Sequence, residues 1–152
     1  LAGTGVSLLQ VYAFLIFAWL HGVDLPPLGM LAVLPALVVT GLMLGALGTL
    51  LSATIRQLEN FAGVMNFVIF PMFFASSALY PLWRIQEASE WLHAVCRVNP
   101  FTYAVELIRF ALYLEFNALA CAVVLAALAL LFGAAAWAYD PSLGLGPRQG
   151  AA

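Results

Sequence analysis

The chain has 152 residues, of which 65% are hydrophobic and only 8% are charged, and its formal net charge is −2. Soluble domains carry about 25% charged residues, so the composition excludes a soluble globular domain and predicts an all-α integral membrane protein. The small acidic net charge offers no basic patch for nucleic acid. No basic segment precedes the first apolar run, which argues against a signal peptide, and we expect the chain to be the C-terminal part of a longer protein.

Four apolar segments are predicted to cross the lipid bilayer, because each is close to the roughly 20 residues that a spanning helix needs. They cover approximately residues 1–21, 28–54, 61–79 and 116–139. The first is predicted to end in a turn at residues 21–27, where Gly and paired Pro break helices. Pro35 interrupts the second span, and Pro71 predicts a kink in the third. The Gly- and Pro-rich residues 140–152 are predicted to form a disordered tail.

Small residues form a stripe on the second predicted span. Gly41, Gly45, Gly48 and Ser52 follow one another at i, i+4, i+7 and i+11, which places them along one side of a helix. Such a stripe allows another helix to approach closely. Packing within the chain and pairing between subunits are both consistent with this pattern.

Charged residues gather between the third and fourth spans. Seven of the twelve fall there: Arg84, Glu87, Glu90, Arg97, Glu106, Arg109 and Glu115. We predict two short helices in this insert, over residues 84–98 and 100–113. The first has an apolar stripe at helical spacing, formed by Ile85, Ala88, Trp91, Leu92, Val95 and Val98. An amphipathic helix with Trp on its apolar face is expected to lie in the membrane interface.

The second short helix is predicted to begin at Asn99 and Pro100, because Asn is a favoured N-cap and Pro a favoured first residue. It is apolar except for one narrow stripe, formed by Thr102, Glu106, Arg109 and Tyr113. At about 14 residues it is too short to span the bilayer, which makes it a candidate re-entrant helix. Glu106 and Arg109 either form a mutual salt bridge that seats the helix or help to line and gate a translocation path.

Several chemistries lack their sequence signals. The chain contains no G-x-x-x-x-G-K-[ST] phosphate-binding loop and no His-Glu-x-x-His metal motif. Cys96 and Cys121 are interpreted as two unpaired thiols. Asn66, the one strongly polar residue well inside a span, is interpreted as a helix–helix hydrogen-bonding group.

The segment from Phe61 to Arg109 resembles the ABC-2 family of ABC-transporter permeases. Four pieces carry the resemblance in order and spacing: Asn66 to Phe74, Ser76 to Pro81, Trp91-Leu92, and Asn99-Pro100-Phe101-Thr102-Tyr103 followed by Glu106 and Arg109. The resemblance implies an export permease in the bacterial cytoplasmic membrane that pairs with a second permease half. A separate ABC ATPase subunit would bind ATP and Mg²⁺, so this chain would bind no cofactor itself and would not be an enzyme.

In the family layout the two short helices face the exterior and act as a gate. The site residues implied there are Asn99, Pro100, Thr102, Tyr103, Glu106 and Arg109. A count of Arg residues alone favours the opposite orientation, but that rule concerns simple loops and this insert is predicted to be folded.

Two other classes of function remain open from the sequence. One is a membrane anchor or assembly subunit that does not transport. The other is a membrane-embedded lipid-modifying enzyme, for which Glu87, Glu90 and His93 are the candidate polar cluster.

Overall fold

The computed structural model describes residues 2–55 and 58–138, and throughout this part of the chain every regular element is an α-helix. The predicted all-α fold is therefore confirmed. Arg56 and the tail at residues 140–152 lie outside the described residues. The helices are α1 (Ala2–Leu20), α2 (Pro27–Thr54), α3 (Leu58–Phe74), α4 (Leu82–Ala88), α5 (Glu90–Val98), α6 (Pro100–Leu112) and α7 (Ala118–Ala138).

Three of the described helices, α1, α2 and α7, are long and apolar enough to cross a membrane. Helix α3 is apolar but has 17 residues, a length of about 26 Å against roughly 30 Å of hydrocarbon. The segment predicted as a span over residues 61–79 is helical only as far as Phe74. It ends there because the Ser76 hydroxyl donates to the Phe73 carbonyl oxygen at 2.6 Å and accepts from the Ala78 N–H, which closes a local turn.

The turn predicted at residues 21–27 is present between α1 and α2. Gly22 adopts a φ of 85°, a left-handed conformation that glycine reaches without strain. The Val23 N–H returns to the Ala18 carbonyl oxygen at 3.1 Å and so closes the end of α1. Pro27 then occupies the first position of α2, where its missing N–H leaves no bond unmade.

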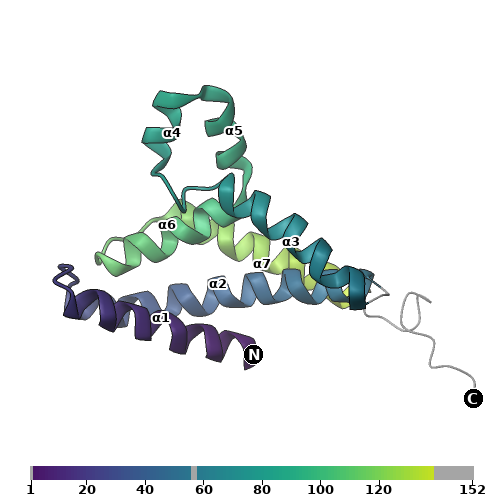
Figure 1. Ribbon diagram of the computed structural model, residues 1–152, viewed down its shortest axis with the longest axis horizontal. Helices are drawn as coiled ribbons and strands as arrows, with labels where there is room; N and C mark the ends of the chain where they lie inside the picture. The colour runs from purple at the N-terminus through teal and green to yellow at the C-terminus, as the bar shows by residue number, and fades with distance from the viewer. Residues whose placement is uncertain (1, 56–57, 139–152) are drawn as a thin grey trace, which may run out of the picture.

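Helix α2 is the centre of the helical body, with α1, α6 and α7 packed around it (Figure 1). Its residues Ala36 and Met43 pack with Ala104 of α6 and Val124 of α7 in one buried cluster. A second cluster joins α1 to α2 through residues that include Leu15 and Val33. Helix α6 touches both clusters through Ile108 and Ala111, so this short helix is fixed in the body of the protein.

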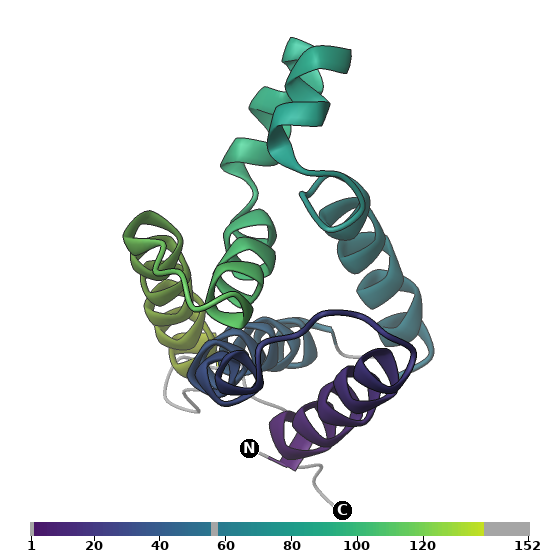
Figure 2. The same cartoon turned by 90° about the vertical axis from the view of Figure 1, so that its left-hand side faces the viewer.

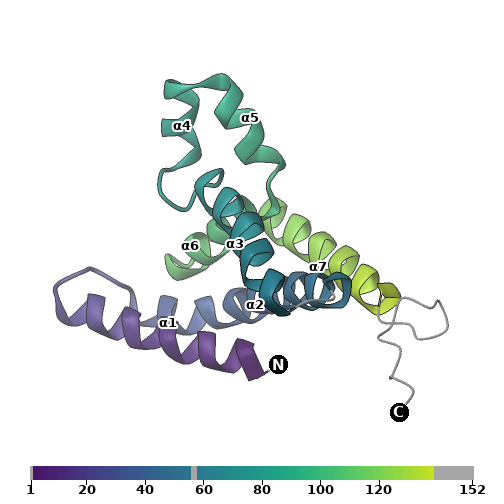
Figure 3. The same ribbon diagram turned by 45° about the vertical axis from the view of Figure 1, so that its right-hand side comes forward.

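Most of α3 stands apart from α6 and α7 (Figure 2). The α4–α5 hairpin projects beyond the other helices (Figures 2 and 3). The helix predicted as one piece over residues 84–98 is divided at Ser89, which has an extended backbone and caps α5 by accepting from the Leu92 N–H. The amphipathic character predicted for this segment is present in α5. On its apolar side, Trp91 is 75% exposed and Val98 is 84% exposed.

Candidate functional site at the junction of α3 and α6

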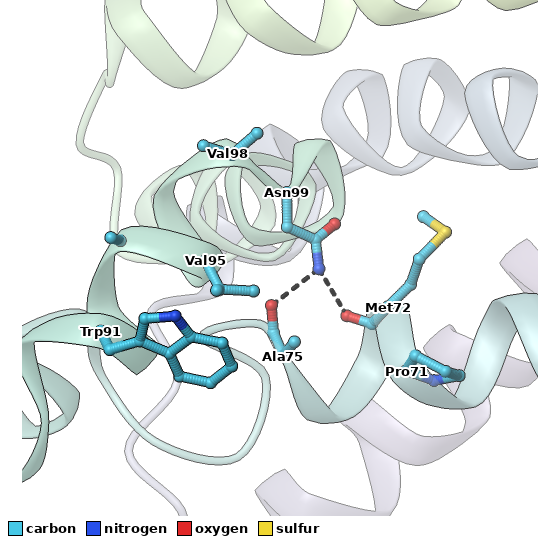
Figure 4. Close-up of a pocket in the computed structure, with 8 residues that line it drawn as sticks. Pro71, Met72, Ala75, Trp91, Val95, Val98 and Asn99 are labelled. Atoms are coloured by element: carbon cyan, nitrogen blue, oxygen red, sulfur yellow. Dashed lines mark hydrogen bonds between the residues drawn. The ribbon is translucent and has the colours of Figure 1, made fainter.

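Asn99 connects the ends of two helices. Its Oδ1 accepts the Phe101 N–H at 3.0 Å and so caps α6, with Pro100 as the first helical residue, as predicted. Its Nδ2 donates to the carbonyl oxygens of Met72 and Ala75, each at 2.7 Å (Figure 4). The last carbonyls of a helix have no partner within that helix. One side chain therefore caps the start of α6 and the end of α3.

Arg109 and Ser77 form a second link between the turn after α3 and α6. The Arg109 Nη2 donates to the Ser77 carbonyl oxygen at 3.1 Å, and the Ser77 hydroxyl donates to the Thr102 carbonyl oxygen at 3.3 Å. Ser76 and Ser77 are both buried. Since Asn99 and Arg109 lie at opposite ends of α6, the turn is held along most of the length of that helix.

The salt bridge considered for Glu106 and Arg109 is not formed, and Arg109 is instead directed to the Ser77 carbonyl. That oxygen lies in a turn outside any helix, where a charged donor satisfies it well. The two side chains still influence each other electrostatically. Partial burial raises the pKa of the Glu106 carboxyl above its ordinary value, and the positive charge of Arg109 acts in the opposite direction.

The predicted polar stripe of α6 runs from the protein interior to its surface. Thr102 is fully buried, and its hydroxyl oxygen has no hydrogen-bond partner among the described residues. Glu106 and Arg109 are half-buried, and Tyr113 is exposed. Tyr103 packs against the cluster shared by α2, α6 and α7. The structure thus joins Thr102 and Arg109 to Ser77, and Asn99 to Met72 and Ala75 at the end of α3. Among the described residues, Glu106 and Tyr103 form no hydrogen bond with this group.

Of the three glycines in the stripe predicted on α2, only Gly41 lies close to another helix. A Cβ at Gly41 would lie 2.8 Å from the Thr4 Cγ2 of α1, so Gly41 permits close packing within the chain. Gly45 and Gly48 have open space around them. The tightest glycine is Gly29, against which the Leu112 carbonyl oxygen of α6 lies so closely that a Cβ would overlap it. Gly29 belongs to no repeating pattern, so the sequence carried no signal for this contact.

Two other expectations concern single polar groups. Asn66 was interpreted as a helix–helix hydrogen-bonding group, but its side chain is exposed on α3 and bonds to no other described residue. The reason is that α3 stands away from the bundle there, so no helix faces it.

Burial raises the pKa of the Cys96 thiol, which disfavours a reactive thiolate at that position. Among the described residues, no group of three or more His, Cys, Asp or Glu is placed to hold a metal ion.

These features define an all-helical, multi-pass membrane protein in which a short, partly buried helix, α6, is linked to the end of an apolar helix, α3. The chain belongs to the ABC-2 type transporter family, whose sequence model matches residues 1–113. The match extends from α1 to the end of α6 and so includes both ends of the polar links.

Two curated proteins are similar to this chain. "Nodulation protein J" of Rhizobium leguminosarum bv. viciae is 28% identical over 109 residues, covering 72% of this chain and 38% of that protein. "Putative transport permease ycf38" of Cyanophora paradoxa is 33% identical over 109 residues, covering 69% of this chain and 36% of that protein. The chain therefore spans little more than a third of the length of these relatives. No solved structure matches it.

Proposed function

We propose that the chain is the C-terminal part of the permease subunit of an ABC-2 type exporter in the bacterial cytoplasmic membrane. The observation that carries this proposal is the family match over residues 1–113. In this proposal, which rests on the family membership, a separate ABC ATPase subunit hydrolyses ATP with Mg²⁺. A second permease half, identical or different, completes the translocation path.

Within this permease, the proposed role of α6 is to shape and gate the external end of the path. Asn99 and Pro100 set where α6 begins, and Thr102 and Arg109 hold the preceding turn against it through Ser77. Glu106 and Tyr103 lie on the same helix but take no part in the hydrogen bonds that join α6 to the end of α3 and the turn after it. Because each link joins α6 to α3, a movement of α3 relative to the body would be transmitted to α6.

Isolation of the full-length protein from its native membrane tests the function as a whole. The expected result is co-purification of a nucleotide-binding subunit whose ATP hydrolysis depends on the permease. Isolation with a different partner, and with no ATPase, would support the anchor interpretation and refute the exporter.

Export by cells carrying Glu106→Ala or Arg109→Ala tests the gate, with Glu87→Ala as the matched control. Glu87 is an exposed carboxylate on α4, so its removal is expected to leave export unchanged. The gate proposal fails if both α6 variants assemble and export as well as the control.

A further inference from the structure

We propose that the cavity between the end of α3 and α5 binds one acyl chain of a membrane phospholipid. This cavity is a groove of about 600 Å³ that is widely open to the surface, and most of the side chains that line it are exposed. Helix α3 and the turn after it supply Pro71, Met72 and Ala75, and α5 supplies Trp91, Val95 and Val98 (Figure 4). The groove borders the α3–α6 junction through Asn99 but contains no residue of the polar stripe of α6. The inference does not depend on the direction or energy source of transport.

The cavity lining favours an apolar occupant. Asn99 contributes its one amide, and both ends of that amide are already committed: Nδ2 to the two carbonyls of α3 and Oδ1 to the Phe101 N–H. The remaining lining residues other than Trp91 have apolar side chains. A polar ligand would therefore lose its hydration there without gaining hydrogen bonds, whereas a hydrocarbon chain loses nothing.

Trp91 suits the position where an acyl chain meets its ester group. Its ring borders the cavity and is 75% exposed, and its indole N–H has no partner among the described residues. Trp side chains concentrate at this depth of the bilayer because the ring is apolar and the N–H can donate. The indole N–H can accordingly donate to an ester carbonyl of the lipid whose chain fills the cavity.

The neighbouring surface also favours lipid as the occupant. Phe70 and Phe74 lie beside the cavity residues of α3 and are exposed, and α5 is amphipathic with its apolar side uncovered. Apolar faces of a membrane protein are solvated by acyl chains, so the cavity is continuous with a surface that lipid covers. A bilayer lipid can therefore enter it from the side.

Quenching of Trp91 fluorescence by a brominated phosphatidylcholine tests this proposal. The full-length protein keeps Trp91 as the only Trp of this region, with Trp19, Trp83 and Trp137 changed to Phe; these three are exposed. The purified protein is titrated in detergent micelles with the lipid, which carries bromine on the upper part of one chain. We expect quenching that saturates at a single lipid per chain. In the matched protein that keeps Trp83 instead, quenching should rise without saturation.

Filling the cavity provides the control. Ala94→Phe places a ring inside the cavity, and Ala75→Leu fills it from the opposite wall; each should reduce Trp91 quenching severalfold. Ala88→Phe adds the same ring on the exposed side of α4 and should change nothing. The proposal is overturned if Trp91 behaves like Trp83, or if both filling variants fold and are quenched like the parent. It is also overturned if the filling variants abolish cross-linking between two copies of the chain while leaving quenching intact.

Discussion

Replacement of Asn99 by Ala is predicted to open the junction between α3 and α6. The substitution removes an N-cap, for which about 1 kcal/mol is typical. It also removes two short hydrogen bonds to α3 carbonyls, each contributing about 1 kcal/mol. The junction should therefore lose about 3 kcal/mol of local stability. Asn99→Asp keeps the N-cap acceptor but removes the two hydrogen bonds to the α3 carbonyls. It should therefore lose at least the stability that those two hydrogen bonds contribute.

The reactivity of Cys96 towards a maleimide measures this opening directly. Cys96 is completely buried three residues before Asn99 and can react only when the junction opens. With Cys121 replaced by Ser, Asn99→Ala should raise the labelling rate roughly a hundredfold, since about 1.4 kcal/mol corresponds to a factor of ten.

Asn117→Ala is the matched control for this experiment. Asn117 caps α7 by accepting the Ala120 N–H at 3.0 Å, and its side chain makes no other hydrogen bond to a described residue. Its loss costs about 1 kcal/mol at a distant helix start, so Cys96 labelling should rise by at most about fivefold. Equal labelling of the two variants would refute the double role assigned to Asn99.

Substitutions at four further positions separate packing from function. Gly29→Ala should destabilise the folded protein by about 1–3 kcal/mol through overlap with an α6 carbonyl. Gly45→Ala lies in open space and should stabilise the protein by at most about 1 kcal/mol. Thermal unfolding in detergent compares the two variants, and equal melting temperatures would contradict the close packing of Gly29 against α6. Thr102→Val removes a hydroxyl that has no partner, so it should leave thermal stability unchanged or raised, and a large loss would mean that the hydroxyl is bonded. Arg109→Ala should lower stability by about 1.5–3 kcal/mol, as expected for a charged hydrogen bond, while Arg109→Lys should restore part of it; no loss in either variant would refute the link to Ser77.

The parts of the fold that were predictable from sequence have local causes. The start of α6 at Asn99 and Pro100 and the turn around Gly22 follow from the conformational preferences of the residues at those positions. The boundary between α4 and α5 at Ser89 also has a local sequence signal, because Ser followed by an acidic residue is a typical helix start. The apolar periodicity across Ser89 obscured it, since the stripe continues from α4 into α5.

The contacts that build the site depend on distant parts of the chain. Arg109 bonds to the backbone of Ser77 rather than to Glu106. Every residue has a backbone carbonyl, so the amino-acid sequence does not indicate which one accepts this hydrogen bond. The approach of Leu112 to Gly29 joins the end of α6 to the start of α2 in the same way. The amino-acid sequence therefore indicated which helix carries the candidate site, and the tertiary structure was needed to identify its partners.

The most direct test of the proposed transport function is the labelling of a cysteine at Glu106 during ATP hydrolysis. The full-length permease carrying Glu106→Cys, with its native cysteines removed, is reconstituted with its ATPase partner and labelled with a membrane-impermeant maleimide. Glu87→Cys on the exposed surface of α4 is the control. We predict that ATP changes the labelling rate at position 106 severalfold and leaves position 87 unchanged. A rate at position 106 that is the same with and without ATP would contradict a gate driven by the partner ATPase.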